Sequence, residues 1–159
     1  FNKNVFVLQE PSVSLTRALK KMQSLEAQSY TPLALALDKV LKMIKVESIK
    51  AKDNIPVIII CSDMGANISA RFPDMEAKTL ADFKLITEEL RVLSRKIGQK
   101  KIRTIIMTPK KSYATRYLGI YPQAATEIID DMKKYAGAEA FEFELKNAKE
   151  TIIKLHKLL

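Results

Sequence analysis

The feature that most constrains this chain is an unbroken apolar run, Val57–Cys61, which stops abruptly at Ser62 and Asp63. The run is too short to cross a bilayer, and its β-branched residues disfavour a helix. Continuous apolarity is typical of a parallel strand that is buried on both faces. We therefore interpret Cys61 as a small core residue rather than a nucleophile. Asp63 follows the carboxyl end of this strand, at the edge where open α/β sheets bind ligands.

The rest of the chain alternates between helical and strand patterns. Thr31 and Pro32 form a strong helix start, and Gly98 is expected to end a long helix as its C′ residue. Such alternation predicts an α/β fold with a doubly wound, mostly parallel sheet and helices on both faces. Residues 1–159 are expected to form one domain. The expected strands lie at 5–8, 57–61, 102–107 and 141–143, and the expected helices at about 12–25, from 31, and at about 76–97, 124–135 and 147–158.

Composition agrees with one globular domain. The chain has 159 residues, of which 47% are hydrophobic and 28% charged, so it can bury a core. No apolar run approaches the roughly 20 residues of a membrane span, and no segment resembles a signal peptide. The single cysteine excludes an intramolecular disulfide. These features predict a reducing, cytoplasmic location without a membrane span.

The net charge of +9 raises nucleic acid as a possible partner. However, lysines recur along every predicted helix, interleaved with glutamate and aspartate. The densest groups are Lys100, Lys101 and Arg103, followed by Lys110 and Lys111, and they flank the second buried strand at its two ends. Solvated helix faces therefore explain the charge better than a specific nucleic-acid site does.

Most enzyme motifs are absent from the sequence. It contains no GxxxxGK[ST], GxGxxG or GxSxG motif and no zinc-type spacing, and its lone His156 lies among lysines near the C-terminus. Two oxygen-bearing residues remain, Thr31 and Asp63, which could meet at the carboxyl edge of the sheet. A hydroxyl and a carboxylate there suit Mg²⁺, which takes oxygen ligands and keeps several waters. The alternatives are that Thr31 is only an N-cap and Asp63 only a turn residue.

Two segments carry a resemblance to a known family. Tyr-Thr-Pro-Leu-Ala-Leu-Ala-Leu (Tyr30–Leu37) and Val-Ile-Ile-Ile-Cys-Ser-Asp-Met-Gly-Ala-Asn (Val57–Asn67) resemble a von Willebrand factor A (VWA) domain, most like that of the magnesium and cobalt chelatase D subunit. In that family a Gly-Thr-Pro-Leu loop and a strand ending in Thr-Asp-Gly-x-x-Asn contribute to a metal-ion-dependent adhesion site (MIDAS). The resemblance covers essentially the whole chain. It implies a Mg²⁺ site with Thr31 as a direct ligand and Asp63 as a direct or water-mediated one.

The chain also departs from the family pattern. The family's first strand carries Asp-x-Ser-x-Ser, which supplies three metal ligands, and this motif does not occur here. Tyr30 and Met64 replace two family glycines, and Gly65 comes one position late. By its two motifs, the chain aligns after the place of that first strand. We therefore expect an N-terminally truncated fold that binds Mg²⁺ weakly and exposes one edge of Val57–Cys61, which is an aggregation hazard.

The resemblance implies a protein-interaction domain that is not catalytic itself. It would belong to an ATP-dependent chelatase D-like subunit that helps to insert Mg or Co into a tetrapyrrole. Its partners would be an AAA+ ATPase subunit and a large porphyrin- or corrin-binding chelatase subunit. One alternative is a generic intracellular VWA interaction module with a degenerate, metal-free site. Another is a phosphate-binding α/β enzyme that uses the same edge, although the chain has no glycine-rich loop for it.

Overall fold

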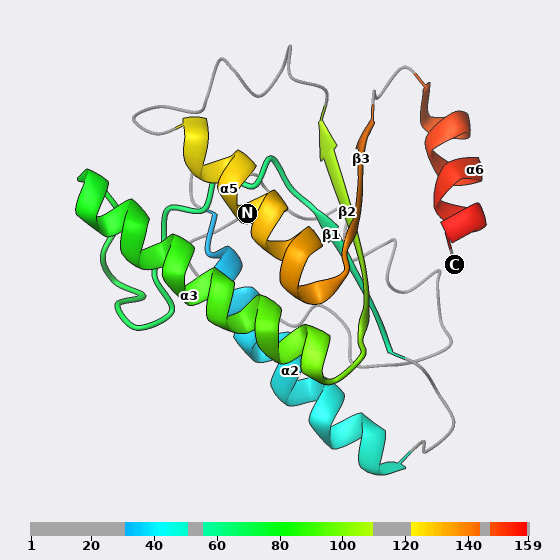
Figure 1. Ribbon diagram of the computed structural model, residues 1–159, viewed down its shortest axis with the longest axis horizontal. Helices are drawn as coiled ribbons and strands as arrows, with labels where there is room; N and C mark the ends of the chain where they lie inside the picture. Colours follow the sequence, from blue (N-terminus) through cyan, green and yellow to red (C-terminus); the bar gives the residue numbers. More distant parts are fainter. Residues whose placement is uncertain (1–30, 51–55, 110–121, 144–146, 159) are drawn as a thin grey trace.

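The computed structural model describes residues 31–50, 56–109, 122–143 and 147–158 (Figure 1). Within these ranges helices and strands alternate along the chain, as the sequence predicts. The expected strand at 5–8, the expected helix at about 12–25, and Lys110 and Lys111 lie outside the described residues. The elements are α2 (Leu33–Lys50), β1 (Val57–Cys61), α3 (Leu80–Gln99), β2 (Arg103–Pro109), α5 (Pro122–Ala136), β3 (Glu139–Phe143) and α6 (Ala148–Leu158).

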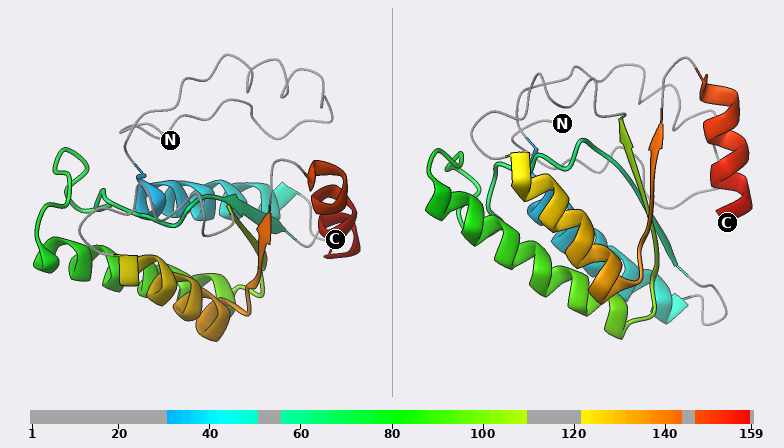
Figure 2. Two further views of the ribbon diagram at one scale, coloured as in Figure 1. Left: turned by 90° about the horizontal axis from the view of Figure 1, so that it is seen from above. Right: turned by 45° about the horizontal axis from the view of Figure 1, so that its top comes forward.

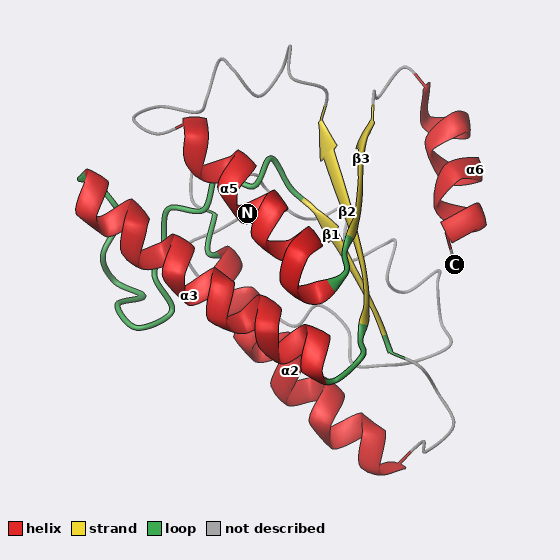
Figure 3. Ribbon diagram, in the orientation of Figure 1, coloured by secondary structure: helices red, strands yellow, loops and turns green. Residues whose placement is uncertain are grey.

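The described strands form one parallel sheet in the order β1-β2-β3 (Figure 3). Ile58 pairs with Thr104, and Ile106 pairs with Ala140. The pairing is parallel because α3 and α5 each return the chain to the edge where the next strand begins. The architecture is therefore α/β, as predicted. None of the helices in the described ranges is long and apolar enough to cross a membrane.

One face of the sheet, which we call the inner face, packs against α2, α3 and α5 (Figure 2). Ile58, Ile60 and Ile106 point into this layer and are buried. The helices contribute apolar side chains at three- and four-residue spacing, which places them along one side of each helix. These side chains are Leu33, Leu37 and Leu41 of α2, Ile86, Leu90, Leu93 and Ile97 of α3, and Ala125, Ile128 and Met132 of α5.

The opposite, outer face is covered unevenly. On β2 and β3, Ile105, Met107 and Phe141 are buried, with Leu155 and Leu158 of α6 packed against them. On β1, Val57 and Ile59 are 40% and 42% exposed, and Cys61 is exposed too. The prediction that this strand is buried on both faces is therefore wrong, as is the interpretation of Cys61 as a core residue. Within the described part of the chain, the outer-face cluster extends over β2, β3 and α6 and leaves β1 outside it.

Helix α3 begins later than the sequence pattern predicted. A capping box at its start explains this, because the Thr79 hydroxyl accepts from the Asp82 N–H and the Asp82 carboxylate accepts from the Thr79 N–H. The carboxylate also accepts from the Lys78 N–H, and these backbone hydrogen bonds hold the pKa of Asp82 below its usual value. The helix therefore starts at Leu80 rather than near Glu76.

The end of α3 corrects the expected role of Gly98. The left-handed position belongs to Lys101, with φ 53°. The N–H of Lys101 donates to the carbonyl of Gly98 at 3.0 Å, and the N–H of Ile102 donates to that of Ile97 at 3.2 Å. These bonds make a Schellman motif with lysine at C′. Gly98 instead lies inside α3, where an added Cβ would stand 2.0 Å from the carbonyl oxygen of Tyr135. The glycine is needed because α3 and α5 approach each other there.

Helix α6 matches its predicted boundaries to within one residue, whereas β3 begins two residues before the predicted 141–143, and not all of the predicted burial is found. Gly137 follows α5 with φ 64°, as expected of a helix-ending glycine. In α6, Leu155 packs against the outer-face cluster. However, Ile152 and Ile153, which were expected near the core, are 66% and 48% exposed. Only one side of this amphipathic helix therefore meets the sheet in the described structure.

Candidate functional site

The candidate site lies where the chain leaves β1. The Ser62 hydroxyl accepts a hydrogen bond from the Met64 N–H at 3.0 Å, and the Asp63 Oδ1 accepts one from the Gly65 N–H at 3.0 Å. Both are side-chain bonds to the backbone two residues ahead, which is the geometry that makes a tight turn. Met64 adopts φ 62° at the centre of this turn and is fully buried. Asp63 thus acts as a turn residue, while its half-buried side chain stays at the carboxyl edge of the sheet.

Asn67 joins this loop to the start of α2. The Thr31 N–H donates to the Asn67 Oδ1 at 2.6 Å, and the Asn67 N–H donates to the Thr31 carbonyl oxygen at 3.3 Å. Thr31 is 8% exposed and Asn67 is half-buried, so this reciprocal pair is partly sheltered from water. The two segments are far apart in the sequence, yet they meet at one edge of the sheet. The structure brings Thr31 to the loop that carries Asp63, and Asn67 makes the connection.

Sequence reasoning assigned no role to Asn67, which organises the rest of the loop as well. Its carbonyl oxygen accepts from the Ala77 N–H at 2.8 Å, and its Nδ2 donates to the Glu76 Oε1 at 3.4 Å. An isolated antiparallel bridge pairs Ile68 with Glu76. The loop therefore folds back on itself instead of running freely to α3. The available signal was an asparagine four residues after Asp63, because asparagine readily bonds to nearby backbone in turns.

A buried carboxylate on α3, which sequence reasoning also missed, holds the far side of the loop. Glu89 is 6% exposed. Its Oε1 accepts from the Ser69 hydroxyl at 2.7 Å, and its Oε2 accepts from the Ala70 N–H at 2.8 Å. The Arg71 guanidinium lies 3.6 Å from Oε1. A buried charge is stable only with such partners, so Glu89 is best explained as an anchor that fixes the loop to α3.

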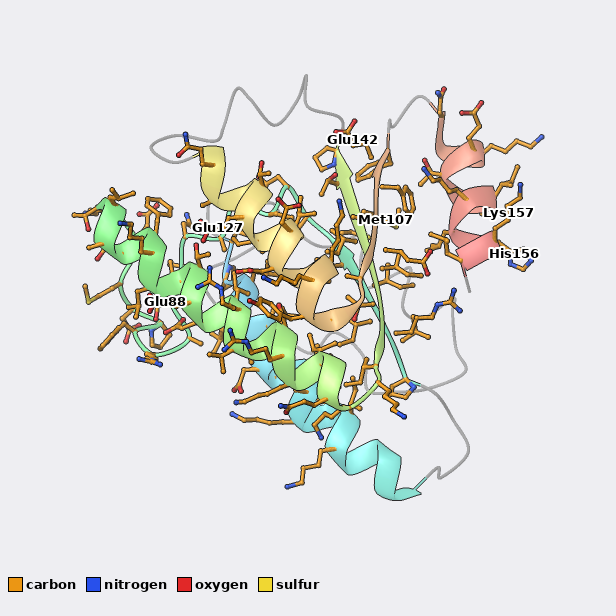
Figure 4. All side chains as sticks on the ribbon, in the orientation of Figure 1. Glu88, Met107, Glu127, Glu142, His156 and Lys157 are labelled. Atoms are coloured by element: carbon orange, nitrogen blue, oxygen red, sulfur yellow. The ribbon has the colours of Figure 1, made fainter. Side chains whose placement is uncertain are left out.

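Two other residues with reactive side chains do not form a catalytic group with this loop. Cys61 places its Sγ 3.8 Å from the Met107 Sδ, and desolvation raises the pKa of its thiol, which disfavours the nucleophilic thiolate. His156 is exposed on α6 and points away from the sheet, as expected for a surface residue (Figure 4). The described residues thus bring neither a thiolate nor an imidazole base to the Asp63 loop.

The metal-binding capacity of the edge depends on few donors. In the part of the chain that the structure describes, no three His, Cys, Asp or Glu side chains gather as a metal-binding group. Thr31 and Asp63 supply one hydroxyl and one carboxylate at the same edge, and both are hard oxygen donors. Such a pair fits Mg²⁺, which can bind through one or two protein oxygens and keep waters elsewhere. The residues are therefore compatible with a water-rich, weak site.

Comparisons of the chain with models of protein families, with curated proteins and with solved structures found no match. A functional proposal must therefore depend on the residues and geometry of the chain itself.

Proposed function

We propose that this chain is a VWA-like protein-interaction domain whose recognition edge comprises Thr31 and the loop from Ser62 to Asn67. The observation that carries the proposal is the reciprocal Thr31–Asn67 pair, at 2.6 and 3.3 Å, which unites the two segments that resemble the family. The left-handed Met64 adds support, because it occupies the position of a family glycine in a conformation that favours glycine. In this proposal the parallel sheet belongs to a doubly wound fold.

The edge is suited to holding a partner rather than to bond chemistry. Asn67 and Glu89 hold the loop on both sides, so the recognition surface is formed before the partner arrives. Thr31 and Asp63 would hold Mg²⁺ together with water, and the ion would offer an open position to a carboxylate of the partner. We extend the proposal to a cytoplasmic, chelatase D-like subunit that binds an AAA+ ATPase subunit and a large chelatase subunit, without acting as the enzyme.

One observation favours a second candidate, a VWA-like module with a metal-free site. The Asp63 Oδ1 already accepts the Gly65 N–H at 3.0 Å, and this bond supports the turn without any ion. In this alternative the same loop recognises its partner by direct hydrogen bonds. The two candidates share the fold and the recognition edge and differ only in their need for Mg²⁺.

Paramagnetic Mn²⁺, a substitute for Mg²⁺, separates the two candidates. In NMR spectra of the chain, we expect Mn²⁺ to broaden the amide signals of Thr31 and of the Ser62–Asn67 loop first. Binding should be weak, because two protein oxygens make a poor cage for such an ion. Asp63→Asn should abolish the selective broadening, whereas Asp74→Asn should preserve it. Asp74 is the matched control because it is an exposed aspartate in the segment that leads to α3.

Uniform broadening, or selective broadening that survives Asp63→Asn, would contradict the metal site and favour the metal-free module. Partner binding is tested separately, with the AAA+ subunit of a magnesium chelatase as the probe. We expect Thr31→Val to weaken that complex and excess Mg²⁺ to strengthen it. Wild-type binding that neither Thr31→Val nor Asp63→Asn alters would overturn this edge as the recognition surface.

A further inference from the structure

The C-terminal ends of α3 and α5 form a second feature, at the edge of the sheet opposite to Asp63. Topology places them there, because α3 and α5 both run from the carboxyl edge back to the amino edge, where β2 and β3 begin. The two ends lie side by side in Figures 1 and 2. They carry exposed cationic residues from both helices and from the turn after α3. We call this set the basic end: Arg95, Lys96, Lys100, Lys101, Lys133 and Lys134.

Close contact between the two helices brings a cation of each to one point of this end. Gly98 lets the α3 backbone approach the Tyr135 carbonyl oxygen. On the same residue, the Arg95 guanidinium lies 4.7 Å and the Lys134 Nζ 5.1 Å from the centre of the aromatic ring. Hydrogen bonds from Arg95 and Lys134 lower the pKa of the Tyr135 hydroxyl. Arg95 of α3 and Lys134 of α5 thus meet at one tyrosine, although they lie far apart in the sequence.

The two segments that carry the basic end contain no acidic residue. Neither 92–102 nor 132–138 contains aspartate or glutamate. Of the neighbouring carboxylates, Glu127 and Asp131 bind Arg91 at 2.9 and 2.8 Å, and Glu139 lies 3.4 Å from Arg103. The exposed Asp130 lies one helical turn before Lys134 and offsets part of the charge. Cations interact favourably with the negative ends of the two helix dipoles. That interaction alone does not account for a group of six. From the sequence, these lysines were expected to be dispersed over separate helix faces. A linear sequence does not show that the C-terminal ends of α3 and α5 are neighbours.

We propose that the basic end is a docking surface for an acidic protein surface. Many phosphate sites use backbone N–H groups at helix N-termini, whereas this surface comprises helix C-termini. Single-stranded nucleic acid is held by aromatic rings that are free to stack on bases, whereas Arg95 and Lys134 already contact the Tyr135 ring. Lysine-rich surfaces without such features attract spread carboxylates by complementary charge and accelerate association. The surface is independent of Thr31 and Asp63, so it adds a second contact to the proposed function.

The test measures binding of the whole chain to fluorescent poly-L-glutamate and, separately, to a DNA duplex of equal total charge. Lys100→Glu/Lys134→Glu reverses two charges of the basic end. Lys149→Glu/Lys157→Glu reverses two exposed lysines of α6 and changes the net charge equally, so it is the matched control. We expect the first variant to weaken poly-L-glutamate binding by about tenfold. The control should weaken it by about twofold or less, because single exposed ion pairs outside the docking surface contribute little. Far-UV circular dichroism melts verify that both variants are folded.

Equal losses in the two variants would show that only the net charge matters and would overturn the proposal. Tighter binding to the duplex than to poly-L-glutamate at about 150 mM salt would also overturn it, in favour of nucleic acid. Lys100→Gln/Lys134→Gln removes the same two charges without reversing them. We expect its affinity for poly-L-glutamate to lie between those of the wild type and of Lys100→Glu/Lys134→Glu. Asp63→Asn should leave poly-L-glutamate binding unchanged or slightly tighter, which separates this surface from the candidate metal edge.

Discussion

The two faces of β1 differ although their residues are equally apolar. Ile58 and Ile60 point to the inner face and are each 6% exposed, whereas Val57 and Ile59 point to the outer face and are about 40% exposed. The inner face lies under α2, α3 and α5, while the outer-face cluster gathers around β2, β3 and α6. Hydrophobic sequence therefore marks which residues can be buried. Whether they are buried depends on which elements pack over each face.

The largest expected effect compares neighbouring isoleucines on the two faces. Ile60→Ala should lower the free energy of unfolding by about 3 to 4 kcal/mol, because it removes buried methyl groups and leaves a cavity. Ile59→Ala should cost about 1 kcal/mol or less, since its side chain is already partly hydrated. Urea unfolding of both variants measures the difference. Similar losses would break the comparison, because they would show that the outer face of β1 is covered in solution.

A smaller effect should come from the close approach of helices in the inner layer. Gly98→Ala should destabilise the chain by about 2 to 3 kcal/mol, because the new Cβ overlaps the Tyr135 carbonyl oxygen and the helices must separate. Gly137→Ala is the control, since nothing lies within 4 Å of its added Cβ. Its cost should be about 1 kcal/mol, caused only by the left-handed backbone. Thermal melts that rank the two substitutions in the reverse order would contradict the packing of α3 on α5.

The smallest expected effect is on the rate of a chemical reaction rather than on stability. The reaction is the labelling of Cys61, which tests directly whether the outer face of β1 is exposed. Because Cys61 is exposed, a disulfide reagent should label it in the folded chain without unfolding. Desolvation raises the pKa of its thiol, so the thiolate fraction at neutral pH is lower than in the unfolded chain. Labelling should therefore be slower than in urea at neutral pH, and the two rates should converge as the pH rises above the pKa of the folded state. Labelling only at the rate of global unfolding would show instead that the outer face is covered.

Much of the described fold was predictable because its signals are local. The apolar runs of β1 and β2 and the three- and four-residue spacing in α3 and α5 identify the elements by themselves. Their alternation predicts a parallel sheet, since a helix must return the chain between strands. The predicted boundaries of α3 were less accurate. The capping box at Thr79 and the Schellman turn at Lys101 fix where the helix begins and ends, and the hydrophobic pattern does not show them.

Some residues of the candidate site could likewise be predicted from local sequence, and others could not. Thr31 and Asp63 could be named from sequence because a helix start and a strand end are recognisable from their neighbours. Asn67 and Glu89 could not, because their roles depend on partners far along the chain. An asparagine in a loop and a glutamate in a helix are common, so only their contacts distinguish them as anchors.

Within the described chain, the sequence by itself determined the kinds of element, the parallel pairing of the strands and the polar end of β1, because each depends on the spacing of neighbouring side chains. The tertiary structure decided which face of β1 is covered and why Gly98 must be glycine. It also decided that Arg95 of α3 and Lys134 of α5 meet at the ring of Tyr135. These outcomes depend on how close separate elements come in space, and that distance is set by side-chain packing across the whole core rather than by any local pattern.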